Sequence, residues 1–245
     1  MRNIKLTIQY DGTRYAGWQS QKNALSIQDI IQGRIRKIVG LKCCLIASGM
    51  TDAGVHAMAQ AANFRTRSRI PLKKLQMALN SALPRDITIS YIEEAPLSFN
   101  AQHDARGKVY RYTIVNNDFT NPFLRNFAAR CFHRLDLRLM RKAAAILKGR
   151  HDFKPFQASG AGRGNTVRTL RRLIIKKDRD VLYLDMEADG FLYNMARTIA
   201  GTLVEAGRGK MPLAQIKDIL RTKDRRLCGP TMPAKGLCLM KVIYR

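Results

Sequence analysis

Apolar and polar residues alternate from Ile4 to Tyr10, and Asp11-Gly12 then gives a turn signal. This period of two predicts a first β-strand. From Ile27 to Ile38 the apolar residues instead recur at the spacing of a helix. Ser26 starts a Ser-x-x-Asp sequence that resembles a helix capping box, so we expect a helix that ends at Gly40.

The rest of the first half continues with the same kinds of pattern. They predict two strands at residues 42–47 and 57–64, a helix at 72–83 that begins after Pro71, and a strand at 87–92. The expected order is strand, helix, strand, strand, helix, strand.

The second half, from about residue 106, repeats this order. The patterns predict a strand at 108–115, a helix from Asp136 to Gly149, a hairpin of strands 168–176 and 181–188, a helix within 190–204, and a closing strand at 237–244. Two matching units predict an α+β protein with two ferredoxin-like (RRM-like) βαββαβ halves, residues 1–105 and 106–245. We expect their strands to form a continuous, mainly antiparallel sheet with a central cleft.

The charge balance of the chain indicates what kind of partner the protein binds. The chain of 245 residues has 44 Lys and Arg against 18 Asp and Glu, a formal net charge of +26. Such an excess indicates a polyanionic partner, and RNA or DNA is favoured over a membrane because no apolar run approaches the ~18 residues of a spanning helix. The N-terminus enters a strand pattern without a signal peptide, so we expect a cytoplasmic protein.

Cysteine and histidine usage gives no indication of a metal or a disulfide framework. The five cysteines are odd in number and lack paired metal-ligand spacing, and the four histidines are scattered. We therefore expect no metal site.

Two isolated charges are the main candidates for chemistry. Asp52 is the only charged residue from Cys43 to Phe64, and Arg197 is the only one between Asp189 and Glu205. The second segment is apolar nearly all round, which predicts a buried helix with Arg197 near its middle. Because charged residues are rarely buried without a partner, we expect Asp52 in a largely desolvated setting, paired with Arg197. The guanidinium would hold the carboxylate ionised, so that it can act as a nucleophile.

Each candidate also has a simpler interpretation. The carboxylate of Asp52 could merely bond the backbone of its Thr-Asp-Ala-Gly turn, and the head of Arg197 could reach solvent from the end of the helix. Tyr110 and Tyr112 share one face of a strand, where they could pack in the core or stack on an unpaired base. Trp18 could belong to the core or to a loop that contacts RNA.

Several segments, in this order, resemble the tRNA pseudouridine synthase A family over the whole chain. They are Gln9-Tyr10-Asp11-Gly12, Gly17-Trp18-Gln19, Thr51-Asp52-Ala53-Gly54-Val55-His56-Ala57, Leu79-Asn80 with Leu83-Pro84, Tyr110-Arg111-Tyr112, His151-Asp152-Phe153, Gly190-Phe191-Leu192 with Asn194-Met195 and Arg197, and Gly236-Leu237.

The resemblance implies two related α+β halves, a homodimer and no cofactor. It implies that uridine becomes pseudouridine at about positions 38 to 40 of the tRNA anticodon stem-loop, where the target base must first leave its stack. It assigns the nucleophile to Asp52, the base-stacking aromatic ring to Tyr110, and the basic partner of the carboxylate to Arg197. Attack at the ribose C1′ or at C6 of the uracil ring stays open.

Two positions depart from the family pattern. Met50 stands where the family usually has arginine just before Thr-Asp, and Gln102 stands where arginine usually follows Phe-x-Ala. The two arginines that this chain lacks are cations expected to contact RNA. The alternative to an active synthase is therefore a weakly active paralogue or a non-catalytic RNA-binding protein, such as an RNA chaperone or assembly factor.

Overall fold

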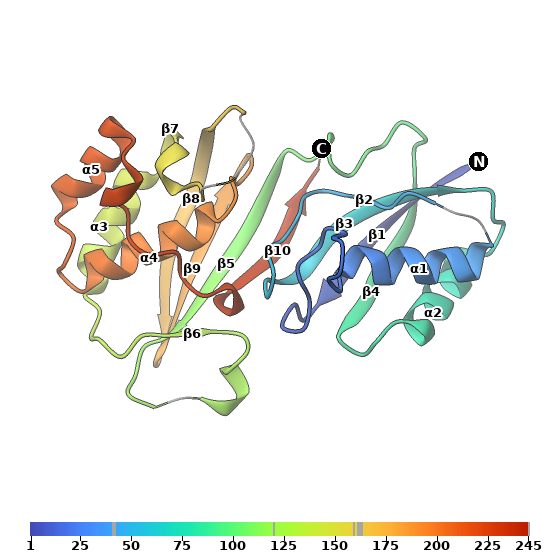
Figure 1. The fold of residues 1–245 in the computed structure, drawn as a ribbon, viewed down its shortest axis with the longest axis horizontal. Helices are drawn as coiled ribbons and strands as arrows, with labels where there is room; N and C mark the ends of the chain where they lie inside the picture. Colours follow the sequence, from blue (N-terminus) through green and yellow to red (C-terminus); the bar gives the residue numbers. More distant parts are fainter. Residues whose placement is uncertain (41–42, 120, 159, 161–163, 245) are drawn as a thin grey trace. The chain divides into compact units, whose positions relative to one another are not determined.

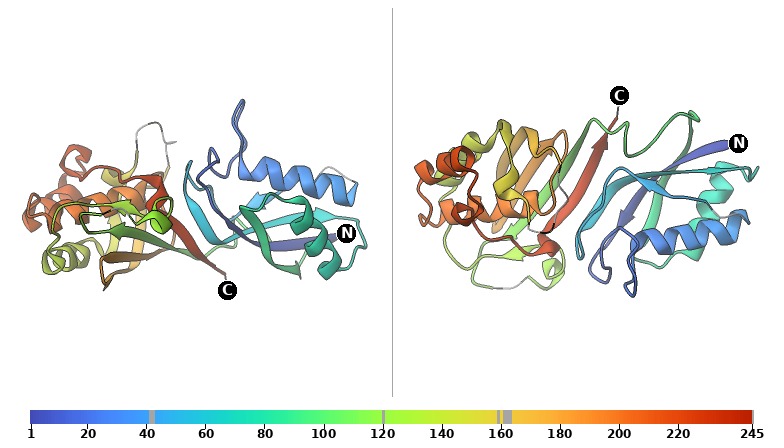
Figure 2. Two further views of the ribbon diagram at one scale, coloured as in Figure 1. Left: turned by 90° about the horizontal axis from the view of Figure 1, so that it is seen from below. Right: turned by 45° about the horizontal axis from the view of Figure 1, so that its top comes forward.

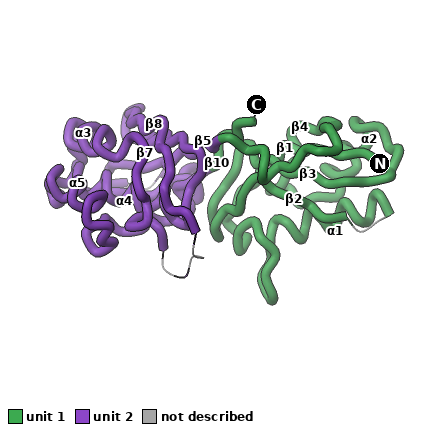
Figure 3. The backbone as a smooth tube through the Cα atoms, turned by 90° about the horizontal axis from the view of Figure 1, so that it is seen from above, with its two compact units in different colours: residues 1–106, 239–245 green, residues 107–238 purple. Residues whose placement is uncertain are grey.

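The structure is a computed structural model that describes residues 1–40, 43–119, 121–158, 160 and 164–244 (Figure 1). The chain divides into two compact units (Figure 3). Unit 1 contains Met1–Arg106 together with Leu239–Arg245, and unit 2 contains Gly107–Cys238. Each unit combines helices with mostly antiparallel strand pairs, so the protein belongs to the α+β class.

Unit 1 has the predicted order of elements. They are β1 (Arg2–Tyr10), α1 (Ile27–Val39), β2 (Ile46–Ala47), β3 (His56–Thr66), α2 (Leu72–Ala82) and β4 (Ile87–Ala95). Strand β1 lies between β4 and β3, strand β2 pairs with β3, and all of these pairs are antiparallel. Strand β10 (Leu237–Ile243) begins in unit 2 and continues into the last part of unit 1.

The two sequence periods explain the first elements of unit 1. In β1 the side chains of Ile4, Leu6 and Ile8 are fully buried, as the alternation predicts. Helix α1 begins at its predicted capping box: Ser26 Oγ accepts from the backbone N–H of Asp29 at 3.1 Å and donates to the Asp29 carboxylate at 2.6 Å. The first helix and the first strand are therefore confirmed.

The strand predicted at 42–47 is wrong in extent. Only Ile46 and Ala47 pair as β2, and Lys42 lies outside the described residues. The backbone of Leu45 instead bonds helix α1: its N–H donates to Gln32 Oε1 at 3.1 Å, and its carbonyl accepts from Gln28 Nε2 at 3.1 Å. Amide side chains thus replace the ladder bonds that a longer strand would have made.

Unit 2 is richer in elements than its sequence pattern predicts. Its strands are β5 (Gly107–Val115), β6 (Ala129–Arg130), β7 (Gly149–Asp152), β8 (Val167–Asp178) and β9 (Val181–Ala188), and its α-helices are α3 (Leu137–Leu147), α4 (Met195–Gly207) and α5 (Leu213–Thr222). Short 3-10 turns lie at Pro122–Leu124, Lys154–Phe156, Arg225–Leu227 and Ala234–Gly236. The antiparallel order is β5-β9-β8-β7, and β6 pairs parallel to β5.

The elements β6, β7 and α5 were not predicted. Two of them are strands of two and four residues, too short to show a period. Helices α3, α4 and α5 group together in unit 2, and α3 packs against β8 (Figure 2). Among the described residues, no helix has the length and apolar character needed to cross a membrane.

Helix α4 approaches a neighbouring backbone unusually closely at Gly201. A Cβ atom added there would lie 1.8 Å from the carbonyl oxygen of Pro230, and a Cβ on Gly229 would lie 2.5 Å from the Gly201 carbonyl carbon. Hydrogen atoms at these two positions therefore allow the segment after Cys228 to lie directly on the helix.

We predict that Gly201→Ala destabilises the protein by about 1 to 3 kcal/mol, because the added methyl group forces the two backbones apart. Chemical denaturation measures the change. The matched control is Gly33→Ala in helix α1, where nothing lies within 4 Å of the added Cβ. That substitution should stabilise the protein by about 0.5 to 1 kcal/mol through helix propensity. Equal effects of the two substitutions would contradict the close packing at Gly201.

Candidate active site

Asp52 lies on the loop between β2 and β3. The backbone N–H of Val55 donates to the Asp52 carbonyl at 3.1 Å and closes a turn, and Gly54 has the left-handed φ of 76° that such a turn favours. The carboxylate therefore stands on a turn, as expected, at the point where β3 begins.

The chain that follows β1 packs directly on this loop. A Cβ on Gly17 would lie 2.6 Å from the Thr51 carbonyl oxygen, and a Cβ on Gly12 would lie 2.0 Å from the Val55 carbonyl oxygen. The N–H of Trp18 donates to the Thr51 carbonyl at 3.0 Å, and the N–H of Gly54 donates to the Tyr15 carbonyl at 3.3 Å. The Asp52 turn is thus held by backbone groups on two sides.

Buried side chains complete the support of the loop. The hydroxyl of Tyr10 and the hydroxyl of Thr51 form a buried hydrogen bond of 2.8 Å. The ring of Trp18, 2% exposed, lies 6.1 Å from the Tyr10 ring, so Trp18 belongs to the core. From β3, the fully buried Gln60 donates to the Gly49 carbonyl at 2.8 Å.

Asp52 itself is half-buried, and the desolvation of its carboxylate stays a prediction. Its uncharged neighbours divide between two environments. Thr51 and Val55 are buried, whereas Ala53 is exposed and Met50 is 59% exposed. A stretch without charged residues can therefore still lie partly at the surface.

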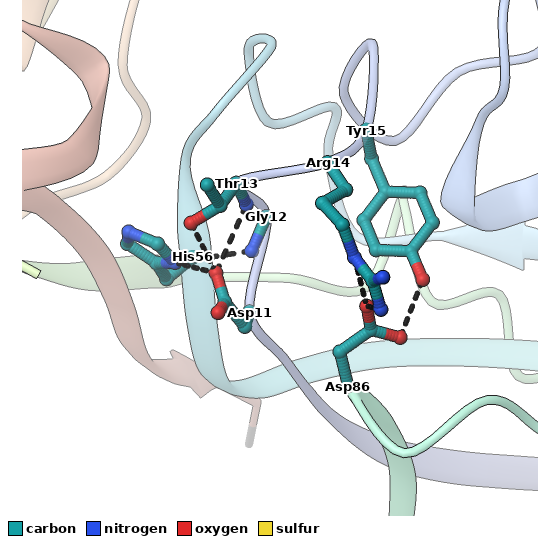
Figure 4. A network of polar contacts seen from close by, with 7 residues as sticks. All are labelled: Asp11, Gly12, Thr13, Arg14, Tyr15, His56 and Asp86. Carbon is teal, nitrogen blue, oxygen red and sulfur yellow. Dashed lines mark hydrogen bonds and ion pairs between the residues drawn. The ribbon is translucent and has the colours of Figure 1, made fainter. Parts of the chain in front are cut away.

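A polar cluster beside the loop was not found from the sequence (Figure 4). The Nδ1 atom of His56, a buried residue, lies 3.1 Å from the Asp11 carboxylate and 3.0 Å from the backbone nitrogen of Gly12. This nitrogen can accept from the Gly12 N–H or donate to Asp11, but one protonation form cannot do both. The Asp11 carboxylate also accepts from the Thr13 N–H at 2.9 Å.

Asp86 forms the second half of this cluster. It accepts from the Tyr15 hydroxyl at 2.5 Å and from the Arg14 guanidinium at 2.5 Å. Burial would raise the pKa of the Asp86 carboxyl, but the hydrogen bonds from Tyr15 and Arg14 outweigh it and hold the pKa below the ordinary value. Burial and the bond to Asp86 raise the pKa of the Tyr15 hydroxyl. Asp11 and Asp86 come together because Tyr10 pairs with Ile87, and strand pairing could not be deduced from the sequence.

Helix α4 in unit 2 carries Arg197. The helix begins at Met195, so Arg197 lies in its first turn, and the predicted mid-helix position was wrong. The apolar residues before it continue the helical pattern but do not form helix, since Asn194 has a left-handed φ of 62°. Arg197 is half-buried, in contrast to the fully buried residues that follow it in the helix.

The guanidinium of Arg197 is oriented by two acceptors. Its Nε donates to the Met232 carbonyl at 2.7 Å, and its Nη1 donates to Asn194 Oδ1 at 2.8 Å. In return, the Met232 N–H donates to the Arg197 carbonyl at 3.3 Å. A cation in the first turn of a helix opposes the helix dipole, which makes these acceptors necessary.

The segment from Gly229 to Met232 runs along α4 and bonds it at several points. The Gly229 N–H donates to Thr202 Oγ1 at 3.1 Å, and the hydroxyls of Thr231 and Thr198 form a hydrogen bond of 3.1 Å. Together with the Met232 bonds, these contacts fix the direction of Arg197.

Tyr110 lies on β5 in the same unit as Arg197. It is 8% exposed, and its ring meets the ring of Phe191 edge to face at 5.0 Å. Tyr112, on the same face, is fully buried and donates to the Pro233 carbonyl at 2.7 Å. Burial raises the pKa of the Tyr112 hydroxyl, and the nearby charge of Arg197 opposes that rise.

The structure thus brings Tyr110, Tyr112 and Arg197 into one part of unit 2 and Asp52 into unit 1. Each is positioned within its own unit by the contacts described above. Among the described residues, no three His, Cys, Asp or Glu side chains gather as a metal ion would require.

Comparisons with known proteins identify the class. A family model described as tRNA pseudouridine synthase matches residues 6–104 and 143–245. The tRNA pseudouridine synthase A of Thermoanaerobacter sp. (strain X514) is 45% identical over 244 residues, and that of Acetivibrio thermocellus is 43% identical over 244 residues. Both alignments cover 100% of this chain and 100% of the relative.

A solved structure of a Cbf5-Nop10-Gar1 complex has a TM-score of 0.38 and 10% sequence identity, covering 97% of this chain and 58% of that chain. This likeness is too low to support an inference.

The chain therefore belongs to the tRNA pseudouridine synthase family. Its activity is that of an isomerase in tRNA processing, and the relatives quoted above carry the name tRNA pseudouridine synthase A. This confirms the resemblance inferred from the sequence motifs.

The buried bond between Tyr10 and Thr51 provides a test of the loop's support. We predict that Tyr10→Phe costs about 1 to 3 kcal/mol, because it leaves the Thr51 hydroxyl buried without this partner. The double variant with Thr51→Val should cost clearly less than the sum of the two single changes. Chemical denaturation of all four proteins measures the coupling. Additive effects would show that the two hydroxyls do not depend on each other.

Proposed function

We propose that the enzyme isomerises uridines at about positions 38 to 40 of the anticodon stem-loop, with Asp52 as the nucleophile that acts on a base flipped out of its stack. The main support is the Asp52 turn: a half-buried carboxylate on a loop fixed by Gly12, Gly17 and Trp18. A carboxylate fixed before substrate binds is suited to nucleophilic attack, since little reorganisation is needed.

The reaction breaks the bond between N1 of uracil and C1′ of ribose and forms a bond between C5 and C1′. C5 loses a proton and N1 gains one, so that substrate and product are isomers. A carboxylate can start it by attacking C1′ or C6, and either route requires the freed base to rotate while it stays bound. The edge-to-face contact of Tyr110 with Phe191 holds one aromatic ring in place. We propose that Tyr110 stacks on the base during this rotation, a contact worth about 1 to 3 kcal/mol.

Arg197 is proposed as the cation that keeps Asp52 ionised. The two residues belong to different units, and their pairing stays a prediction. Its support within unit 2 is the orientation of the guanidinium by Met232 and Asn194. Neither of these two acceptors carries a formal charge.

The finer architecture is also a proposal. The order of elements in unit 1, with β1 between β4 and β3 and with β2 on β3, supports a ferredoxin-like half. The continuous sheet and central cleft expected from the sequence stay predictions. We also propose a cytoplasmic homodimer without a cofactor, on the basis of the family resemblance.

Met50 and Gln102 are both exposed, so neither is required for packing. Their replacement of the family's usual arginines is therefore proposed to change contacts with RNA. A weakly active or non-catalytic paralogue remains the alternative that the activity assay addresses.

We predict that Asp52→Asn lowers pseudouridine formation at least ~10³-fold, since removal of a nucleophile eliminates the covalent route, while tRNA affinity stays within about twofold. Chemical mapping of pseudouridine in unmodified tRNA measures the product and its position. The matched control is Asp178→Asn, which removes the same charge from an exposed site at the end of β8.

Asp178→Asn should keep wild-type activity. An Asp52→Asn enzyme with substantial activity would rule out the nucleophile, and wild-type product outside the anticodon stem-loop would rule out the proposed positions. If the wild type makes no product where the Thermoanaerobacter relative is active, the non-catalytic alternative is correct.

We predict that Arg197→Met shifts the acidic limb of the pH–rate profile to higher pH by about 1 to 3 units. A cation lowers the pKa of a neighbouring carboxylate, so its removal lets the pKa of Asp52 rise. A single-turnover pH series measures the limb. Arg221→Met, on an exposed face of α5, is the matched control. A loss of stability without a shifted limb would assign Arg197 a structural role.

A further inference from the structure

Unit 1 carries a dense group of cations at the end of β3 and the start of α2. Residues 65–74 include five Arg or Lys and no Asp or Glu. All five are exposed. Arg65 donates to a backbone carbonyl, and we call the other four the basic rim: Arg67, Arg69, Lys73 and Lys74. None of these four side chains forms an ion pair or hydrogen bond with any residue that the structure describes.

The cations next to the basic rim, unlike those of the rim, have partners among the residues that the structure describes. Arg2 is bound to Glu94 at 3.0 Å, and Lys5 is bound to Glu93 at 2.8 Å. Arg65 donates to the Leu97 carbonyl at 2.8 Å. The acidic side chains of this region are thus already paired with other cations, and the charge of the basic rim is not neutralised.

The backbone between β3 and α2 is fixed by hydrogen bonds to side chains outside the basic rim. Arg2 Nη1 donates to the carbonyls of Ser68 at 3.2 Å and Ile70 at 2.9 Å. The N–H of Ser68 donates to Thr66 Oγ1 at 3.1 Å, and the N–H of Ile70 donates to Ser68 Oγ at 3.3 Å. Because these bonds fix the loop before any ligand arrives, binding there would cost little ordering of the backbone.

The placement of these charges has no rationale in stability. Lys73 and Lys74 lie in the first turn of α2, where cations oppose the helix dipole, and that turn has no acidic residue. In α1, by contrast, Arg36 and Lys37 lie in the last turn, where the dipole favours them. Four unpaired cations close in sequence also repel one another, so binding of a polyanion would reduce this electrostatic repulsion.

The basic rim is remote from Asp52 within unit 1. Asp52 precedes β3 at His56, and the rim follows β3 at Thr66; the antiparallel partner β1 spans the same length, from Tyr10 to Arg2 (Figure 1). A strand of 11 residues extends roughly 33 Å. An RNA contact at the rim therefore involves nucleotides other than those at the catalytic loop.

We propose that the basic rim binds backbone phosphates in an arm of the tRNA outside the anticodon stem-loop, and so acts as a second anchor for the substrate. This rests on the proposed placement of the anticodon stem-loop at Asp52. The recognition is electrostatic and independent of base sequence, because contacts to backbone phosphates carry no sequence information directly.

The test compares two RNAs with one variant. The variant replaces all four rim residues by glutamine: Arg67→Gln, Arg69→Gln, Lys73→Gln and Lys74→Gln. The RNAs are a full-length unmodified tRNA and its isolated anticodon stem-loop, and the dissociation constant of each is measured over a range of salt concentrations. Full-length tRNA should bind at least about tenfold more weakly, and its salt slope should fall by roughly 0.7 to 0.9 per lost phosphate contact. The affinity for the stem-loop should stay within about twofold.

A matched control removes the same amount of charge elsewhere. It replaces Arg172, Lys176, Lys177 and Arg179 by glutamine, at exposed positions of the β8–β9 hairpin that also carries Asp178 and Asp180. This variant should bind both RNAs nearly as the wild type does. An equal loss for the control would show a general effect of net charge and would overturn the proposal.

Two other outcomes would also overturn it. Unchanged affinity for full-length tRNA would show that the rim does not contact RNA, and an equal loss for the stem-loop would place the rim on the target arm. Hydroxyl-radical footprinting of the tRNA should show protection outside the anticodon arm that the rim variant alone loses. Binding and footprints are measured without turnover. The result can therefore be interpreted even if Asp52 is shown not to be the nucleophile.

Discussion

The close approach of two backbones around Asp52 is the constraint on which the candidate site depends. Glycine at positions 12 and 17 lets the chain after β1 lie against the Asp52 turn at distances that a Cβ atom would forbid. Hydrogen bonds from Trp18 and Gly54 then use that proximity. The position of the carboxylate is therefore set by main-chain geometry, which side-chain motion alters little.

The same principle operates in unit 2, where a cation rather than an anion is positioned. Gly201 and Gly229 allow the segment after Cys228 to lie on α4, and the Met232 carbonyl then directs the Arg197 guanidinium. Both candidate catalytic charges are thus held through contacts between glycine and a neighbouring backbone. Electrostatic stabilisation of a reacting group is most effective when the charges are fixed in advance.

The sequence predicted the elements with a clear period and the residues with a clear chemical context. Helix α1, with its capping box, and strand β1 show this best. Periodicity failed for Arg197, since the apolar run before it continues a helical pattern while Asn194 adopts a left-handed conformation. The sequence also did not show that the uncharged neighbours of Asp52 divide between core and surface.

The polar cluster of Asp11, His56 and Asp86 could not have been found without strand pairing, because its members come from three separate parts of the chain. The glycine contacts are equally invisible in one sequence, where glycine also marks ordinary turns. What a single sequence lacks in both cases is the identity of the neighbour across space.

The segment from Gly229 to Met232 has no regular secondary structure, and such segments usually tolerate insertions and deletions. Here Gly229, Thr231 and Met232 bond Thr202, Thr198 and Arg197 of α4, in that order along the helix. A change in length would slip this register and move the acceptor away from the guanidinium. An insertion or deletion at this stretch would therefore disturb Arg197, although the stretch lies outside every helix and strand.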